Sequence, residues 1–267
     1  MKKIFFSAIL CLLALSPLRL KAETIPASDT RLTFVGRILT QGTDVSFDWT
    51  AVYCRIAFSG KSLTMRASDV KYDANPELAA TRHTYFNVWI DAPMSAEPHR
   101  IIEVAGADSV YELIDPQYLK KSKLKSHQVI IQKRTEGEQG KTTIHEFTTN
   151  GKFFQAETLK ERQLEFIGDS YTCGYGIDAP SRKDRFTPET ENASRSYAGI
   201  VSRYFDADYV AIAHSGMGIA RNYNSKFKNW WMPDRYLQTF DEDSTQVNRW
   251  DATKSDFHPA MTIVYLG

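Results

Sequence analysis

Apolar and polar residues alternate in short runs through the first half of the chain, between about residues 31 and 149. A period of two is the pattern of a strand with one buried face. Glycines and polar turns separate the runs, and no long helical period interrupts them. This repetition predicts a β-sandwich, of the jelly-roll kind, over residues 23–155. The expected strands are 32–38, 45–49, 53–58, 62–67, 85–90, 100–104, 110–114, 128–132 and 143–147.

The pattern changes after Leu164. Continuous apolar runs, of the kind that form buried parallel strands, cover residues 164–168, 208–213 and 261–266. Residues 196–205 place apolar side chains at helical spacing. Strands that alternate with helices predict an α/β domain with a parallel sheet over residues 160–267. The carboxyl ends of its strands then share one edge, where open sheets of this kind bind ligands.

Ser170 stands where the first of these apolar strands ends, in the string FIGDSYTCGYG over residues 166–176. The strand delivers Ser170 to the ligand-binding edge, and Gly168 permits a tight turn off the strand. A helix that begins at Ser170 would point the Ser170 N–H toward a developing oxyanion. These residues predict a nucleophilic serine, with a simple helix cap after a strand as the alternative.

Gly168-Asp169-Ser170 resembles the first sequence block of the SGNH (GDSL-type) hydrolases. The longer string over residues 166–176 resembles the acetyl esterases of carbohydrate esterase family two. Residues 213–218 (AHSGMG) resemble the second block with its oxyanion glycine, and residues 262–267 (TIVYLG) resemble the strand that leads to the third block. The β-rich first half suits the same family, which carries a sandwich domain ahead of the hydrolase domain.

The resemblance implies a serine esterase that removes O-acetyl groups from plant cell-wall polysaccharides such as xylan and mannan. Ser170 would be the nucleophile, and the backbone N–H groups of Ser170 and Gly216 would bind the oxyanion. Gly218 is the rival for the second N–H. The resemblance implies no metal and no organic cofactor, and no Cys/His spacing in the sequence suggests a metal site.

The family pattern continues with Gly-x-Asn-Asp in the third block and with an Asp-x-x-His segment near the carboxyl terminus. The sequence ends at Gly267, before the positions where the third-block Asn and that His would stand. We therefore expect a fragment whose hydrolase domain lacks its carboxyl-terminal part and which is inactive as an esterase. His214 lies on the correct edge of the sheet, but the family takes its base from elsewhere. Asp169 is expected to accept backbone N–H groups within its own loop.

The stretch after the second block is a candidate carbohydrate surface. Arg221, Asn222, Tyr223 and Trp230 offer hydrogen-bonding groups and flat rings, which an acetylated polysaccharide or oligosaccharide requires. A loop whose aromatic rings pack onto the sheet is the alternative. Aromatic residues of the sandwich could likewise stack on sugars or fill its core, and the core is favoured for Trp49, Tyr53, Tyr85, Phe86 and Trp89.

Other functions stay open at this point. One is a carbohydrate-binding protein without catalysis, and another is an SGNH esterase or lipase of different specificity. Cys54 and Cys173 follow the signal-like segment, and we expect no disulfide bond between them.

Residues 1–22 have the pattern of a secretory signal. Lys2 and Lys3 precede an apolar run too short to span a membrane, and Ala22 offers a small residue for cleavage. We expect export to the periplasm or the cell exterior. The segment carries four Lys or Arg and no Asp or Glu, so its removal changes the net charge from +1 to about −3. This charge gives no electrostatic case for nucleic acid or an anionic membrane as partner, and the oligomeric state stays open.

Overall fold

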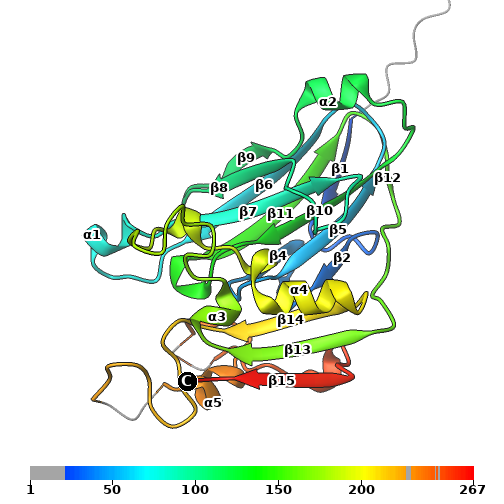
Figure 1. The fold of residues 1–267 in the computed structure, drawn as a ribbon. Coiled ribbons are helices and arrows are strands. Elements are labelled where there is room, and N and C mark those ends of the chain that lie inside the picture. Colours follow the sequence, from blue (N-terminus) through cyan, green and yellow to red (C-terminus); the bar gives the residue numbers. More distant parts are fainter. Residues whose placement is uncertain (1–21, 227–229, 244, 246) are drawn as a thin grey trace, which may run out of the picture.

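The computed structural model describes residues 22–226, 230–243, 245 and 247–267. Two antiparallel sheets form a sandwich, and a three-stranded parallel sheet lies below it in Figure 1. The predicted signal segment lies outside the described residues, except for Ala22. Within the described part of the chain, no helix has the length and apolar character needed to cross a membrane.

The first six-stranded sheet has the order β3-β4-β11-β6-β9, with β1 beside β11. Its strands are β1 (Glu23–Pro26), β3 (Leu39–Gln41), β4 (Asp44–Phe47), β6 (Leu63–Val70), β9 (Ser109–Glu112) and β11 (Lys141–Thr149). The second has the order β12-β5-β10-β7-β8, with β2 beside β5. Its strands are β2 (Thr33–Val35), β5 (Tyr53–Phe58), β7 (Thr84–Ile90), β8 (Arg100–Val104), β10 (His127–Lys133) and β12 (Phe153–Phe154).

Short helical turns connect these strands. They are α1 (Pro76–Ala79), α2 (Pro116–Lys121) and the 3-10 turn η1 (Gly137–Gln139) between β10 and β11. The sequence pattern did not predict α1 or α2, since each is too short for a helical period to show. Each of these two helices instead begins with a proline, Pro76 or Pro116. The residue before it, Asn75 or Asp115, caps the helix by accepting a backbone N–H.

The burial pattern of β6 shows why an alternation of apolar and polar residues predicts a strand. Leu63, Met65 and Ala67 face the core, and full burial of a side chain the size of Leu63 or Met65 contributes about 1.5–3 kcal/mol. Asp69 continues the buried face, and its carboxylate accepts from Thr142 Oγ1 at 2.8 Å and from the Lys71 ammonium at 2.6 Å. The antiparallel sheets expected from the sequence are confirmed, and their jelly-roll character stays a prediction.

The aromatic residues of the sandwich belong to its core. Trp49, Tyr53, Phe86 and Trp89 are all buried, so their faces cannot stack on a sugar. Tyr85 is half-buried and donates its hydroxyl to Glu189 at 2.9 Å. The core interpretation is therefore the correct one for the four buried rings.

The parallel sheet has the order β14-β13-β15, as expected from strands that alternate with helices. Gly168 at the end of β13 pairs with Ala213 on one side and with Tyr265 on the other, so the carboxyl ends of the strands share one edge. The three arrows point the same way in Figure 1. The elements are β13 (Gln163–Gly168), α3 (Ser170–Cys173), η2 (Pro188–Thr190), η3 (Ala193–Arg195), α4 (Tyr197–Tyr204), β14 (Asp208–Ala213), α5 (Met232–Tyr236), η4 (Ala252–Lys254) and β15 (Met261–Tyr265).

Helix α4 confirms the predicted helix, but its buried face differs from its apolar residues. The side that packs inward carries Ala198, Gly199 and Ser202, whereas Ile200 and Tyr204 are exposed. The close approach of η3 explains this, because a side chain on Gly199 would lie 2.4 Å from the Ser194 carbonyl oxygen. Small residues are needed where α4 packs against η3.

Buried polar contacts join the sandwich to the parallel sheet. Asp208, the first residue of β14, accepts hydrogen bonds from the Tyr53 hydroxyl at 2.7 Å, from the Arg55 guanidinium, and from the Lys160 N–H at 2.8 Å. Next to it, Gln132 donates to the Tyr209 hydroxyl at 3.0 Å. Apolar residues of both parts also form one continuous core. The division into units 23–155 and 160–267 stays a prediction.

We expect Asp208→Asn to lower the free energy of unfolding by about 3–5 kcal/mol, because the Arg55 charge would stay buried without its partner. Chemical denaturation of the full chain measures this. The control is Asp206→Asn, which removes the exposed partner of Lys160 and should leave the free energy of unfolding almost unchanged. Equal losses in the two variants would contradict the importance of the buried pair.

Candidate active site

Ser170 lies in a tight turn from strand to helix. Asp169 caps α3, with its Oδ1 accepting from the Tyr171 N–H at 3.1 Å, and its Oδ2 accepts from the Gly267 N–H at 3.3 Å. The expectation that Asp169 holds its own loop agrees with these contacts. Gly174 ends the helix with φ +75°, where a side chain would lie 2.3 Å from the Asn192 carbonyl oxygen. The turn therefore needs glycine for both conformation and space.

The loop after β14 brings Gly216 to the same edge. Gly216 has φ +76°, and its carbonyl accepts from the Tyr223 N–H at 2.7 Å. Its own N–H has no partner among the described residues, and neither has the Ser170 N–H. The Gly218 N–H, in contrast, donates to Asn222 Oδ1 at 3.3 Å. Gly216 is thus better placed than Gly218 to donate to a ligand.

Ser170 and Gly216 line one pocket of about 900 Å³. Of the predicted carbohydrate-binding residues, Arg221, Asn222 and Tyr223 also line it. Arg221 and Tyr223 are exposed, whereas Asn222 is half-buried and donates to the Trp230 carbonyl at 3.1 Å. Asn222 therefore ties its own loop together.

Trp230 does not line this pocket, although the sequence analysis selected it. Its ring lies 5.5 Å from the Arg235 guanidinium, in a cation–π contact. The residue type was compatible with sugar binding, but the direction of the ring depends on the loop.

The pocket also contains residues that the sequence analysis missed. Glu138 reaches it from η1 in the sandwich, where its carboxylate accepts from the Arg82 guanidinium at 2.9 Å. Tyr175 lines it as well and stacks on Phe186 with ring centroids 3.7 Å apart. Nothing in the local pattern around Glu138 signals a site, because η1 reads as a glycine-punctuated turn between two strands.

His214 is engaged in a buried charge network outside the pocket. Its Nδ1 lies 2.7 Å from Asp241 Oδ2 and 3.3 Å from Glu242 Oε1, and the Arg235 guanidinium donates to Asp241 Oδ1 at 2.7 Å. Burial opposes the charge of His214, but the Asp241 carboxylate and Glu136 outweigh it and raise the pKa of His214 to about 9. These contacts occupy Nδ1 of His214, and the residue does not line the pocket that holds Ser170.

None of the histidines of the chain lines the pocket that holds Ser170. His258 lies at the opposite end of the parallel sheet, where its N–H donates to Gln163 Oε1 at 2.5 Å. His83, His99, His127 and His145 belong to the sandwich. The described residues therefore bring a serine and two backbone donors together without a histidine base.

Among the described residues, two groups contain side chains that could ligate a metal. His214, Asp241 and Glu242 form one, but Arg235 already occupies the position a cation would take. Glu136, Cys173 and Glu191 form the other. Burial raises the pKa of the Cys173 thiol well above its usual range, which disfavours the thiolate that binds metal. Cys54 and Cys173 are both free, in agreement with the sequence analysis.

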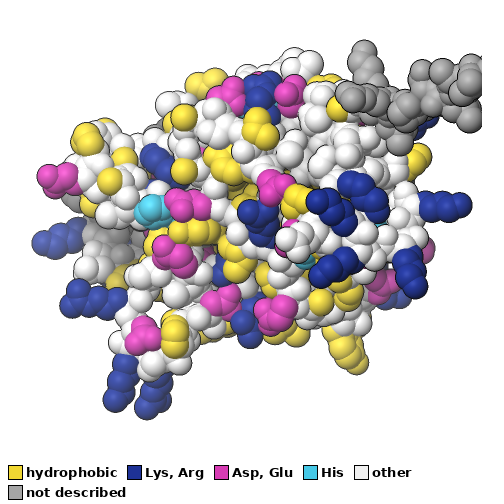
Figure 2. Space-filling view, turned by 90° about the horizontal axis from the view of Figure 1, so that it is seen from above, with side chains coloured by type: hydrophobic (Ala, Val, Ile, Leu, Met, Phe, Trp, Pro, Cys, Tyr) yellow, Lys and Arg dark blue, Asp and Glu magenta, His cyan; other side chains and the backbone are white. Residues whose placement is uncertain are grey.

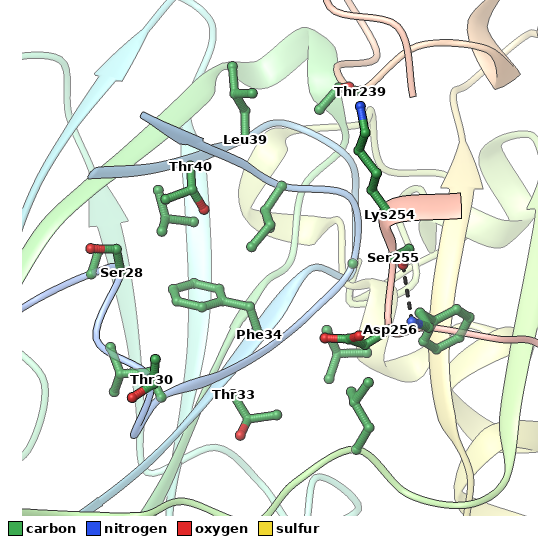
Figure 3. Close-up of a pocket in the computed structure, with 18 of the residues that line it drawn as sticks. Ser28, Thr30, Thr33, Phe34, Leu39, Thr40, Thr239, Lys254, Ser255 and Asp256 are labelled. Atoms are coloured by element: carbon green, nitrogen blue, oxygen red, sulfur yellow. Dashed lines mark hydrogen bonds between the residues drawn. The ribbon is translucent and has the colours of Figure 1, made fainter. Parts of the chain in front are cut away.

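A second cavity of about 900 Å³ lies beside β2 and β3 (Figure 3). The Phe34 ring and threonine side chains line one wall, and Lys254 and Asp256 come from the facing segment. It contains none of the predicted site residues. On the face shown in Figure 2, acidic and basic side chains are interspersed with hydrophobic ones.

The parallel sheet places a serine at the end of its central strand, beside a glycine turn from the next strand. The solved structure of a putative GDSL-like lipase from Bacteroides ovatus shares this fold, with a TM-score of 0.51 and 9% identity over 75% of this chain and 59% of that one. At this identity the likeness shows the fold alone.

Residues 34–156 match the family model described as carbohydrate esterase 2 N-terminal. An acetylxylan esterase / glucomannan deacetylase of Cellvibrio japonicus is 32% identical over 206 residues, which are 71% of this chain and 48% of that protein. The structure of a family two carbohydrate esterase from Cellvibrio japonicus has a TM-score of 0.78 at 25% identity, over 92% of this chain and 68% of that one. The chain is therefore similar to the family-two carbohydrate esterases, and the predicted resemblance is confirmed. It spans between 17% and 63% of the length of the curated relatives that it matches.

The charge of His214 predicts a pH dependence of stability. Because the pKa of His214 is about 9 in the folded chain and about 6.5 in an unfolded one, its contribution is complete below pH 6.5. That contribution, on the order of 3 kcal/mol, should be lost as the pH rises through 9. Urea denaturation of the full chain from pH 6 upward, beside His214→Gln, measures it. A variant that retains the wild-type slope would show that His214 is not the group responsible.

Proposed function

We propose that the protein is a serine esterase that removes O-acetyl groups from plant cell-wall polysaccharides such as xylan or mannan. The observation that carries this is the convergence of the Ser170 hydroxyl with two unpartnered backbone N–H groups, of Ser170 and Gly216, on one pocket of about 900 Å³. Donors of this kind stabilise negative charge that develops on an ester oxygen. The relatives named above support the choice of an acetyl ester.

In the proposed reaction, Ser170 Oγ attacks the acetyl carbonyl carbon and gives its proton to a general base. The carbonyl oxygen becomes an oxyanion that accepts from the N–H groups of Ser170 and Gly216. Collapse of this intermediate breaks the ester bond, and the sugar hydroxyl leaves with the proton. Water then attacks the acetyl-serine, which releases acetate and restores Ser170. The base is not one of the six histidines, since none of them lines the pocket.

The pocket suits a polar ligand with flat faces. Tyr175 and Tyr223 offer aromatic rings, and Arg221 and the Glu138 carboxylate offer hydrogen bonds to sugar hydroxyls. We propose an acetylated polysaccharide or oligosaccharide as the partner. From the pattern of residues 1–22, we also propose that the protein is exported from the cell, where it would meet this partner. Two domains, a jelly-roll-like sandwich and an SGNH hydrolase domain, would together build the site.

A second candidate is carbohydrate binding without catalysis. The absence of any histidine from the pocket lining favours it for the chain as given. Binding of acetylated xylan fragments without release of acetate, under conditions where an external base is supplied, would distinguish this function from the esterase.

We expect the full chain to hydrolyse para-nitrophenyl acetate above the solution background once imidazole is added. Imidazole can enter the open pocket and take the proton that no histidine of the pocket takes. Ser170→Ala should reduce the rate to that of imidazole alone, because acyl transfer needs the serine oxygen. Acetate release from acetylated xylan is the second measurement. A Ser170→Ala rate equal to wild type would show that the nucleophile is misassigned.

Gly216→Ala should lower kcat more than it raises KM. The donor N–H acts mainly on the oxyanion. Alanine keeps this N–H but changes its direction through the backbone, so the cost in the transition state should not exceed the roughly 3 kcal/mol typical for complete loss of one such donor. The added Cβ has room, with Tyr223 Cβ 3.6 Å away, but φ of +76° strains it. Gly42→Ala is the control, because Gly42 has φ +61° and open space in the sandwich. Gly218→Ala is not a clean comparison, since its Cβ would lie 2.1 Å from the Arg221 carbonyl oxygen.

If Gly42→Ala lowered kcat as much as Gly216→Ala, backbone strain would explain the loss and the oxyanion assignment would fail.

A further inference from the structure

Glu136 is a buried carboxylate of the sandwich that reaches the loop carrying Gly216. It precedes η1, and its side chain is fully buried. Its Oε2 accepts from the Ser215 N–H at 2.6 Å, and its Oε1 accepts from the Ser215 hydroxyl at 2.7 Å. One carboxylate therefore satisfies both donors of the residue immediately before Gly216.

The same carboxylate also contacts the helix that begins at Ser170. The Cys173 thiol, at the end of α3, lies 3.7 Å from Glu136 Oε2 and donates to it. The nucleophile helix and the glycine loop come from different strands of the parallel sheet, and Glu136 comes from neither strand. It bridges the two segments from the side of the sandwich.

We propose that Glu136 is a positioning residue, which fixes the direction of the Gly216 N–H relative to Ser170. The inference rests on the proposed esterase function. The peptide group between Ser215 and Gly216 carries that N–H. The Ser215 N–H belongs to the preceding peptide group, so the two hydrogen bonds fix the backbone nitrogen and the side chain of Ser215, the residue from which the next peptide presents the Gly216 N–H. On its other side, the Gly216 carbonyl accepts from the Tyr223 N–H at 2.7 Å. Preorganised donors of this kind do not have to reorganise when the oxyanion forms.

Glu136 is itself held in place by the core. Its N–H donates to Glu191 Oε1 at 3.2 Å, and its carbonyl accepts from the buried Lys133 ammonium at 2.8 Å. His214 faces it with Nδ1 3.9 Å from Oε2. A hydrogen bond to a carboxylate in such a buried place is stronger than one in water, so the bridge is rigid.

The contacts are strongest with a carboxylate. Ser215 donates its N–H and its hydroxyl to the two oxygens of Glu136, and hydrogen bonds to an ionised group are shorter and stronger than neutral ones. A Gln would keep one acceptor for the Ser215 N–H, but its NH2 group would force the Ser215 hydroxyl to accept instead of donate. Glu136→Gln should therefore weaken the hold on Ser215 without changing the volume of the core.

In the imidazole-supplemented esterase assay, we expect Glu136→Gln to lower kcat by about tenfold to a hundredfold, the loss typical of a small misplacement of a catalytic group. KM should stay unchanged, since Glu136 does not line the pocket. Glu191→Gln is the matched control, because it removes another buried negative charge of the same cluster while its amide oxygen can still accept from the Glu136 N–H. We expect it to keep the wild-type kcat.

Ser215→Ala provides a second variant if Glu136→Gln fails to fold. It removes only the hydroxyl donor and should give a smaller loss of kcat. A wild-type kcat in Ser215→Ala together with a wild-type kcat in a folded Glu136→Gln overturns the proposal. A fall in kcat for Glu191→Gln that equals the fall for Glu136→Gln also overturns it, since loss of any buried charge would then suffice.

A spectroscopic measurement separates this proposal from the proposed function. In a proton–nitrogen correlation spectrum of the full chain labelled at serine, the Ser215 amide proton should appear far downfield because of its short bond to a carboxylate. Glu136→Gln should move it upfield, and Glu191→Gln should not. If the chemical shift of the Ser215 amide proton is the same in Glu136→Gln as in the wild type, the positioning role is overturned. A wild-type chain without Ser170-dependent turnover instead overturns the esterase function, whatever the amide does.

Discussion

The buried polar contacts between the sandwich and the parallel sheet are the constraint on which the rest of the structure depends. Asp208 begins β14 inside the protein, where its charge is tolerable only because Arg55 and Tyr53 of β5 meet it. Strand β13 pairs with β14 in register from Gln163 to Gly168, so the position of Asp208 also decides where Ser170 emerges. A contact at one end of the sheet thus determines the place of the site at the other.

Periodicity in the sequence predicts the elements, but not the contacts that orient them. Strand β5 reads YCRIAF, and all six residues are buried, so Arg55 in that run is a local sign that a partner must exist. Its partner Asp208 lies 153 residues further on, and no period in the sequence connects the two. Helix α4 shows the same limit, since its apolar residues predict a helix and its small residues decide which face is buried.

Some residues of the candidate site could likewise be predicted from the sequence, and others could not. Ser170 and Gly216 could be predicted, because strand, glycine turn and helix start lie within a few residues and the chemistry is local. Glu136 and Glu138 could not, since they come from a short turn of the other unit. Gly137 between them has meaning only in the folded chain, where a side chain would lie 2.3 Å from Asp241 Oδ2. The sequence analysis selected Trp230 for its residue type, but the residue type alone does not predict whether the ring points into the pocket.

The sandwich is therefore part of the site rather than a separate module. Asp48 in the sandwich accepts the Asp241 N–H at 2.7 Å, Asp241 binds His214, and His214 precedes the Ser215 turn that Glu136 holds. His214 is buried within this chain of contacts and does not line the pocket that holds Ser170. The sandwich also lines the pocket directly, through Glu138. It thus contributes one wall of the pocket through Glu138 and, through Glu136, holds the residue that precedes Gly216.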